Sequence, residues 1–237
     1  MKKYGVVFDM DGVISDTQKY HGAWELAILS KYGINTVSPD SNVPITIDWI
    51  QKNFSWVQPK ERVKDIFYAH NKSDLFNIDM IEEEKNQYFL STYPTANINF
   101  INWAKKLIYN LFDSNEVYLF VVTASTRWAM ETVLWKLDII NLFDEIVSVY
   151  DIDVNTGKQY TKKSDPDVYN NLKNKYNIWD SFVMIEDGSA GMDGAIKAWW
   201  KAIAILSGNP ISKFPQAVSH HEDLTSISLE EIKKILS

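Results

Sequence analysis

The sequence predicts an α/β fold in which a parallel sheet, covered by helices on both faces, is interrupted by an inserted helical domain. Short apolar runs rich in β-branched and aromatic residues are typical of buried parallel strands. The segments between the later runs have the apolar spacing of helices, which fits the crossover connections of such a sheet. The runs lie at residues 4–8, 117–122, 146–149, 182–185 and 202–206.

The first two strands are separated by an unusually long segment. It holds roughly a hundred residues, far more than one crossover helix needs, and its apolar residues recur at helical spacing. We therefore expect a helical domain at residues 17–92, inserted into an α/β core made of residues 1–16 and 93–237. The helices expected in the insert lie at 24–32, 45–54, 63–68 and 81–90. Those expected in the core lie at 98–111, 128–137, 167–176 and 190–199.

The composition excludes several classes of protein. Acidic residues outnumber basic ones, 31 against 24, and the formal net charge of -7 argues against a nucleic-acid-binding surface. The absence of cysteine excludes disulfides, zinc–thiolate sites and thiol catalysis. No apolar run approaches the length of about 18 residues that a membrane-spanning helix needs. We therefore expect a cytoplasmic enzyme that binds neither nucleic acid nor membrane.

Two aspartates, Asp9 and Asp11, follow the first expected strand directly. Residues two apart in an extended chain point the same way, and Gly12 permits the close backbone approach that a phosphate-binding loop needs. Two carboxylates about 4 Å apart repel by about 4 kcal/mol at an effective dielectric constant of about 20, so the pair indicates a compensating cation. The alternative is a strand-ending aspartate followed by a turn aspartate.

Polar residues also follow other expected strands. Thr123 ends the second strand and Ser125 precedes a helix, where hydroxyls and backbone amides form an anion site or, alternatively, a helix N-cap. Glu186 and Asp187 end the fourth strand, and Lys163 precedes a helix start, where in isolation it would be a solvated lysine. Because the carboxyl ends of parallel strands meet at one edge of the sheet, we expect these residues to converge there with the two aspartates.

This set of residues fits phosphoryl transfer. Oxygen ligands without His or Cys suit Mg²⁺, which offsets the repulsion between a carboxylate nucleophile and an anionic phosphate. We expect Asp9 to attack phosphorus and form an aspartyl-phosphate, and Asp11 to act as general acid and base. Thr123 and Lys163 would hold and neutralise the transferred group, and Ser125 would contact the substrate. The candidate metal ligands are Asp9, Asp11, Glu186 and Asp187.

The order of these motifs resembles that of the haloacid dehalogenase superfamily, and the match spans nearly the whole chain. The motifs are residues 9–13 (DMDGV), Thr123, Lys163 and residues 186–187. The resemblance implies a Rossmann-like core, an aspartyl-phosphate intermediate, and Mg²⁺ bound by Asp9, the carbonyl oxygen of Asp11 and Asp187. It also implies that the helical insert is a cap that closes over the substrate. The acid at Asp11 sets this chain apart from the dehalogenases proper.

Within that superfamily, residues 8–24 (FDMDGVISDTQKYHGAW) resemble β-phosphoglucomutase and its phosphatase relatives, with residues 15–17, His21 and Trp24 as the matching details. In the mutases, the histidine that matches His21 helps to couple cap closure to placement of the general acid. The alternative for His21 is a half-buried helix residue. Lys85 lies where those caps carry a lysine that contacts the far phosphate, and the alternative is a solvated helix lysine. His21 and Lys85 are therefore candidate substrate-binding residues.

Departures from the mutase pattern favour a phosphatase of a small phosphorylated metabolite, with a β-phosphoglucomutase-type phosphosugar mutase as the alternative. The mutases clamp a second phosphate with an arginine of the cap, whereas this sequence has no arginine before Arg62. Gly188 replaces the usual serine after the acid pair. Trp199 and Trp200 stand where relatives have Ala-Gly, which suggests a packing patch. Residues 220–222 (HHE) are expected in a surface loop.

Two further classes compete with these hypotheses. A phospho-accepting receiver of the response-regulator kind also uses acids, a hydroxyl residue and a lysine on a parallel sheet. Its acid pair and phosphoacceptor lie on different strands, however, and it is much shorter and has no cap. A non-catalytic binding protein is the other alternative. The intact set of acids, hydroxyl and lysine argues against it.

Overall fold

The computed structural model describes residues 2–54, 59–153, 156–157, 159–160, 162–178 and 181–237. The chain forms two compact units. One combines Met1–Asp16 with Ile98–Ser237, and the other is Thr17–Asn97. The second unit is therefore inserted into the first, between its first and second strands.

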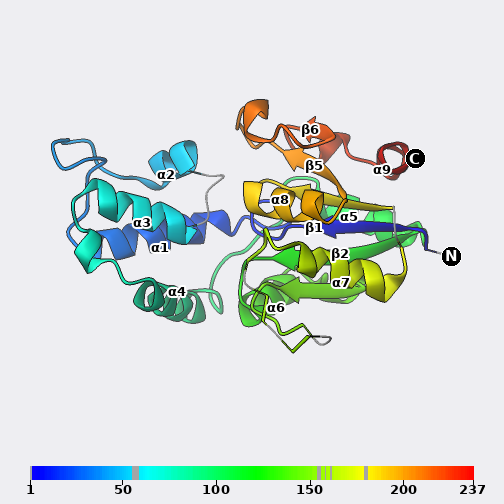
Figure 1. Ribbon diagram of the computed structural model, residues 1–237, viewed down its shortest axis with the longest axis horizontal. Coiled ribbons are helices and arrows are strands. Elements are labelled where there is room, and N and C mark those ends of the chain that lie inside the picture. The colour runs from blue at the N-terminus through cyan, green and yellow to red at the C-terminus, as the bar shows by residue number, and fades with distance from the viewer. Residues whose placement is uncertain (1, 55–58, 154–155, 158, 161, 179–180) are drawn as a thin grey trace. The chain divides into compact units, whose positions relative to one another are not determined.

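The first unit is built on a six-stranded sheet in which every neighbouring pair is parallel (Figure 1). The strands are β1 (Tyr4–Phe8), β2 (Val117–Thr123), β3 (Glu145–Ser148), β4 (Phe182–Glu186), β5 (Lys201–Ile205) and β6 (Ser219–His221). Their spatial order is β3-β2-β1-β4-β5-β6. All five residues of β4 are buried, as expected of a strand covered on both faces. The α/β fold class expected from the sequence is confirmed.

Helices cover this sheet, and on one face of it two helices pack on the strands through a cluster of buried side chains. The helices are α5 (Ala104–Asp113), α6 (Arg127–Lys136), α7 (Pro166–Tyr176), α8 (Ser189–Lys197) and α9 (Leu229–Leu236), with short 3-10 turns η2 (Ile140–Leu142), η3 (Ile211–Lys213) and η4 (Leu224–Ser226). Tyr169 and Leu172 of α7 and Met192 of α8 share a buried cluster with Phe120 of β2 and Met184 of β4. Only residues 187–188 separate the end of β4 from the start of α8, so this packing fixes the direction in which α8 leaves the strand end.

Several expected elements differ in their bounds, as the helix expected at 24–32 does by beginning at Gln18, and three differences have a clear structural cause. Residues 220–222 were expected in a surface loop, but His220 and His221 belong to the edge strand β6 (Ser219–His221) beside β5. The helix expected at 98–111 begins only at Ala104, after Trp103 adopts a left-handed backbone with φ 70°. The helix expected to reach residue 199 ends at Lys197, because Trp199 is also left-handed, with φ 63°. A left-handed residue cannot continue a right-handed helix.

The second unit is helical. Its elements are α1 (Gln18–Lys31), α2 (Ile47–Phe54), α3 (Pro59–Ala69), the 3-10 turn η1 (Ser73–Leu75) and α4 (Ile78–Thr92). Trp24 and Ile28 of α1, Phe67 of α3 and Ile81 of α4 meet in a common buried core. Asn77 caps α4, since its side chain accepts a hydrogen bond from the amide of Met80 at 3.0 Å.

The second compact unit extends to Asn97, and the domain bound at Thr92 stays a prediction from the sequence. Tyr93 is fully buried, with its ring centroid 4.9 Å from that of Phe89. The Tyr20 hydroxyl donates to the carbonyl oxygen of Asn97 at 2.9 Å. These contacts bind the residues after α4 to the helical core.

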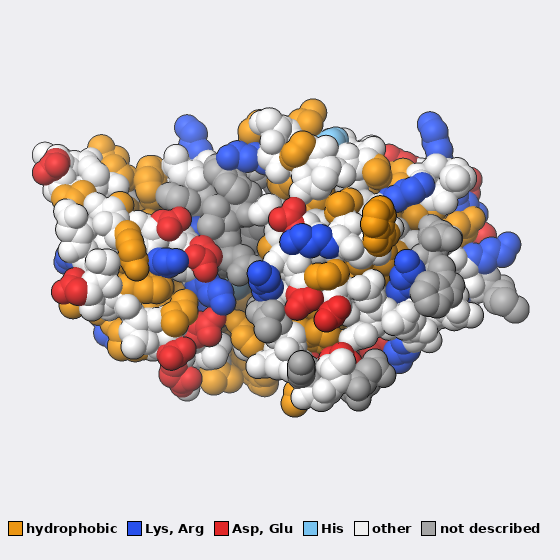
Figure 2. Space-filling view, viewed as in Figure 1, with side chains coloured by type: hydrophobic (Ala, Val, Ile, Leu, Met, Phe, Trp, Pro, Cys, Tyr) orange, Lys and Arg blue, Asp and Glu red, His pale blue; other side chains and the backbone are white. Residues whose placement is uncertain are grey.

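The carboxyl ends of β1, β2 and β4 lie side by side. Phe8 is in register with Val121 of β2 and with Ile185 of β4, so the residues that follow these strands emerge together at one edge of the sheet. On the face shown in Figure 2, acidic and basic side chains are interspersed rather than gathered by sign. In the part of the chain that the structure describes, no helix has the length and apolar character needed to cross a bilayer.

Candidate active site

The loop after β1 is a tight turn that fixes the first two candidate acids. Asp9 is only 6% exposed, and its Oδ1 accepts a hydrogen bond from the amide of Met10 at 2.7 Å. Gly12 has φ 94°, a conformation that costs a side-chain-bearing residue free energy. The turn closes where the Gly12 amide donates to the carbonyl oxygen of Ser15 and the Ser15 amide to that of Met10, both at 2.9 Å.

Lys163 bridges Asp9 and Glu186. Its Nζ lies 2.5 Å from Oδ1 of Asp9 and 2.7 Å from Oε2 of Glu186, and all three residues are buried. Burial acts to lower the pKa of Lys163, but the charges of Asp9 and Glu186 outweigh it and leave the pKa well above its ordinary value. The lysine is therefore charged at every physiological pH.

Small residues of α8 make room for this ion pair. A methyl group on Gly191 would lie 2.7 Å from the carboxyl carbon of Glu186 and 2.8 Å from Cε of Lys163, so only glycine fits without displacing both side chains. The buried hydroxyl of Tyr169 lies 3.0 Å from the carbonyl oxygen of Lys163 and 3.1 Å from that of Gly191. α7 and α8 thus hold the lysine from two sides.

Asp9, Glu186 and Asp187 form a buried carboxylate cluster. One carboxylate oxygen from each lies within 4.8 Å of the others. Burial and then the charge of Asp9 raise the pKa of Glu186 well above its usual range, while its Oε1 accepts the amide of Gly188 at 2.9 Å. When ionised, the three carboxylates carry more negative charge than Lys163 offsets, and all their donor atoms are oxygens. A hard divalent cation fits this cluster.

Asp11 points to a second group, made of hydroxyls. Its Oδ2 accepts hydrogen bonds from Oγ of Ser125 at 2.7 Å and from Oγ1 of Thr123 at 3.3 Å. The Ser125 amide in turn donates to Thr123 Oγ1 at 3.1 Å. Ser148 at the end of β3 donates to the carbonyl oxygen of Ser125 at 2.7 Å and so positions this loop from the neighbouring strand.

The structure brings together all the site residues predicted from the strand ends. They fall into the carboxylate–lysine group of Asp9, Lys163, Glu186 and Asp187 and the hydroxyl group of Asp11, Thr123 and Ser125. His21 and Lys85 lie in the helical unit, on α1 and α4. The His21 ring packs against Phe89, with centroids 4.7 Å apart.

Sequence reasoning missed three supporting residues. Tyr169, Gly191 and Ser148 hold the candidate residues in place but carry no motif of their own. The pair Gly191 and Gly194, three apart on one helix, was the available signal, because two glycines on one helical face permit close approach to another segment.

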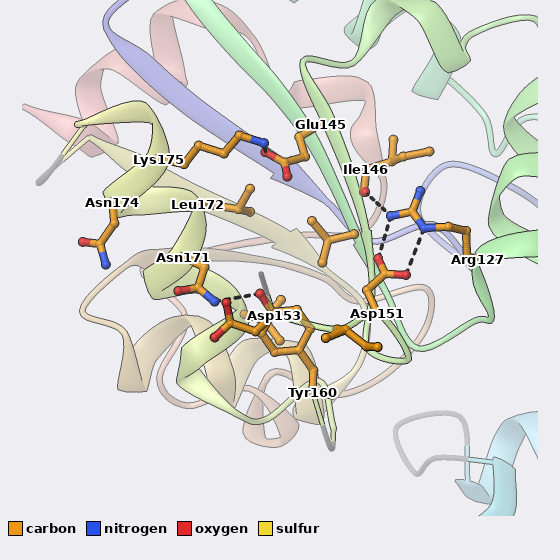
Figure 3. A pocket seen from close by; sticks show the side chains of 13 residues that line it. Arg127, Glu145, Ile146, Asp151, Asp153, Tyr160, Asn171, Leu172, Asn174 and Lys175 are labelled. Atoms are coloured by element: carbon orange, nitrogen blue, oxygen red, sulfur yellow. Dashed lines mark hydrogen bonds and ion pairs between the residues drawn. The ribbon is translucent and has the colours of Figure 1, made fainter. Parts of the chain in front are cut away.

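A separate cavity of about 700 Å³ lies beside the edge strand β3, lined by residues of α6, β3, α7 and the loop after β3 (Figure 3). Arg127 is held there by Asp151, at 2.9 Å from Nε and 2.6 Å from Nη2, and its Nη2 also donates to the carbonyl oxygen of Ile146 at 3.0 Å. The guanidinium is thus occupied in covering the open edge of β3.

The fold and the site define an α/β enzyme built around carboxylates at its strand ends. The model of the haloacid dehalogenase-like hydrolases matches residues 6–205. The chain therefore belongs to the haloacid dehalogenase-like hydrolase family. No curated protein matches its sequence significantly.

Solved structures share the fold over nearly the whole length of the chain. A conserved haloacid dehalogenase-like protein of unknown function from Agrobacterium tumefaciens has a TM-score of 0.73 at 16% identity, covering 99% of this chain and 98% of its own. CbbY from Rhodobacter sphaeroides, solved with phosphate, has a TM-score of 0.71 at 19% sequence identity, and the match covers 98% of this chain and 100% of that chain. β-Phosphoglucomutase from Clostridium difficile has a TM-score of 0.70 at 22% sequence identity, and the match covers 100% of this chain and 97% of that chain.

Proposed function

We propose that this chain is a magnesium-dependent phosphatase of a small phosphorylated metabolite and that Asp9 is its nucleophile. The observation that carries the proposal is the buried contact of Asp9 with Lys163 inside a carboxylate cluster. The Lys163 ammonium lies 2.5 Å from Asp9 Oδ1 and so supplies positive charge beside the proposed nucleophile, and carboxylates are known nucleophiles in phosphoryl transfer. We assign the reaction to the cytoplasm on the basis of composition.

Asp9, Glu186, Asp187 and the carbonyl oxygen of Asp11 are the groups we assign to Mg²⁺. When bound, the ion offsets the repulsion between the carboxylate cluster and an anionic substrate and stabilises charge on the transferred group. The excess of negative charge in the cluster supports this assignment.

The reaction has two displacements. Asp9 Oδ attacks phosphorus, the bond from phosphorus to the leaving oxygen breaks, and Asp11 donates its proton to that oxygen. Asp11 then takes a proton from water as the water oxygen attacks the aspartyl-phosphate, which releases inorganic phosphate and restores Asp9. Lys163 neutralises Asp9 and the phosphoryl oxygens throughout.

Thr123 and Ser125 hold the phosphoryl group in this scheme. Their hydroxyls now donate to the Asp11 carboxylate, and a phosphoryl oxygen is an acceptor of the same kind. We infer that the incoming phosphoryl group takes over these two hydroxyls, which releases Asp11 to reach the leaving oxygen. The helical domain, residues 17–92 by sequence, acts as the cap, with His21 and Lys85 as its candidate substrate contacts.

Transfer to water is favoured over transfer to a second sugar phosphate. A mutase must hold a bisphosphate at both ends, which is the task of an arginine clamp. The chain has two arginines. Arg62 is buried 2.5 Å from Glu25, and Arg127 is held by Asp151 and Glu131. Both guanidinium groups are thus already committed to internal carboxylates.

The test is a screen of phosphorylated metabolites with Mg²⁺ and with a chelator, using Asp9→Asn and, as a matched control, the exposed Asp113→Asn. We expect Mg²⁺-dependent phosphate release by the wild type and by Asp113→Asn, and none by Asp9→Asn. Incubation with β-glucose 1-phosphate and a trace of bisphosphate separates the alternatives, because a mutase accumulates glucose 6-phosphate and a phosphatase free phosphate. No turnover of any phosphomonoester by the wild type would refute the proposal.

A further inference from the structure

The chain crosses between its two units twice, and the two crossing segments are joined to each other. Asp16 is the last residue before the helical unit, and Asn99 follows soon after the return at Ile98. The Asp16 amide donates to the carbonyl oxygen of Asn99 at 3.0 Å. The Asn99 amide donates to Asp16 Oδ1 at 2.8 Å, and Asn99 Nδ2 donates to Asp16 Oδ2 at 3.1 Å. We call this pair the linker clasp.

In the linker clasp, the hydrogen-bond donors of Asn99 match the acceptors of Asp16 in number. Asp16 presents two acceptor oxygens, and Asn99 presents two donors in the required positions, one from its backbone and one from its side chain. Hydrogen bonds to an ionised carboxylate are stronger and shorter than neutral ones. An alanine at either position would lose at least one of these bonds.

The linker clasp continues directly into the loop that carries Asp11. The Ile101 amide donates to the carbonyl oxygen of Ile14 at 2.9 Å, and Phe100 pairs with Ser15 in an antiparallel bridge. Ser15 also forms a bridge with Asp11. Backbone hydrogen bonds therefore connect the returning segment, through Ser15, to the backbone of Asp11.

We propose that Asp16 and Asn99 are positioning residues for the proposed general acid and base. They touch no reacting atom and act through the backbone of the Asp11 loop, by holding the two crossing segments at a fixed separation. The inference rests on the proposed function for its kinetic test. Its structural part, that the linker clasp orders the loop from Gly12 to Ser15, is independent of any activity.

The test uses the full-length protein with single and exchanged variants. Asp16→Ala and Asn99→Ala are expected to lower kcat by about tenfold or more, since small misplacements of a catalytic group have effects of this size, while KM stays within about twofold because substrate contacts are unchanged. Asn99→Asp places two carboxylates together and is expected to be as defective. The double variant Asp16→Asn with Asn99→Asp again pairs a side-chain amide with a carboxylate, with the two groups exchanged, and should recover most of the kcat. Asp113→Ala, on the exposed surface of α5, is the matched control and should leave kcat unchanged.

Amide hydrogen exchange gives a readout that does not depend on catalysis. Asp16→Ala and Asn99→Ala are expected to accelerate exchange at Gly12, Ser15 and Ile101 while leaving the strand amides of β4 protected. The exchanged variant should return the rates toward those of the wild type. Unchanged exchange at Gly12 and Ser15 in both alanine variants would overturn the proposal, and so would wild-type kcat in them. An inactive wild type with the expected exchange pattern would refute the phosphatase function and leave the ordering role standing.

Discussion

Two buried ion pairs, one in each unit, have similar geometry and different surroundings. In the helical unit, Arg62 Nη2 lies 2.5 Å from Glu25 Oε1, with side chains 9% and 0% exposed. In the sheet unit, Lys163 lies 2.5 Å from Asp9 and is equally buried. Among the described ion pairs, Arg62 contacts one carboxylate, that of Glu25, whereas Lys163 contacts both Asp9 and Glu186, and Asp9 belongs to a cluster with a third carboxylate.

The difference shows why charge balance, rather than burial, separates a structural pair from a candidate reactive one. A balanced pair between α1 and α3 contributes to the packing of those helices, and hydrophobic side chains of similar volume could replace it at little cost. A cluster with surplus negative charge is costly unless a bound cation offsets that charge, so such a cluster is a candidate functional site. We therefore interpret the first pair as structural and propose that the second belongs to the active site.

The largest expected effect comes from removing the lysine of the unbalanced cluster. Lys163→Met should lower kcat/KM by about 10²–10³-fold, since it takes away the positive charge nearest to the proposed nucleophile. Lys175→Met is the control, because Lys175 forms an exposed ion pair with Glu145 and should retain full activity. Steady-state kinetics with the best substrate checks both variants. A wild-type kcat/KM in Lys163→Met would contradict the distinction between a structural Arg62–Glu25 pair and a functional Lys163 cluster.

Breaking the balanced pair should affect stability and leave catalysis intact. Arg62→Met leaves the fully buried Glu25 carboxylate without its guanidinium and is expected to lower the free energy of unfolding by about 3–5 kcal/mol. The double variant Glu25→Leu with Arg62→Met should recover most of that loss and keep a kcat/KM near that of the wild type. Urea denaturation measures the first result. A double variant as unstable as the single one would show that the pair does more than balance charge.

A smaller effect is expected from a substitution that disturbs the packing of α8 against the unbalanced cluster. Gly191→Ala pushes a methyl group against Glu186 and Lys163 and should cost about 1–3 kcal/mol of stability through overpacking, with a clear loss of kcat. Lys197→Ala, on the exposed side of the same helix, should stay within about 0.5 kcal/mol of the wild type. Thermal unfolding and kinetics of both variants check this, and equal behaviour of the two would contradict the close packing.

The smallest effect is a pH dependence of the balanced pair. Burial raises the pKa of Glu25, and the charge of Arg62 offsets this only in part. Folding therefore favours the protonated acid, so its contribution to stability is present below the ordinary glutamate pKa and is lost as pH rises through the folded-state pKa. Relative to Glu25→Gln, the wild type should lose free energy of unfolding as pH rises above about 4, the ordinary glutamate range, and through the raised pKa of the folded state. Denaturation of both at several pH values checks the sign, and an opposite slope would place the pKa below its usual range.

Much of the fold followed from local pattern, because buried parallel strands are continuous apolar runs and stand out from amphipathic helices. β6 was missed because it has only three residues, two of them histidines, and its pairing with β5 is a tertiary contact. The left-handed Trp103 delays the start of α5 and the left-handed Trp199 follows the end of α8, at positions where propensity alone predicts continuous helix.

The candidate site was predictable to the extent that it lies at strand ends. Asp9, Thr123 and Glu186 were expected to converge because parallel strands share one carboxyl edge. Tyr169 and Gly191 were not, since their contacts with Lys163 exist only once α7 and α8 pack on the sheet. The pairing of Arg62 with Glu25, 37 positions apart in the sequence, is of the same kind.

The most direct test of the central claim is to find the residue that carries the phosphoryl group. The protein is mixed with its best substrate and Mg²⁺, quenched in acid within the first turnover, digested, and analysed by mass spectrometry. We predict one added phosphoryl group on the peptide containing Asp9 in the wild type and none in Asp9→Asn, which should also lack turnover. A phosphoryl group on another residue, or full turnover by Asp9→Asn, would contradict the account.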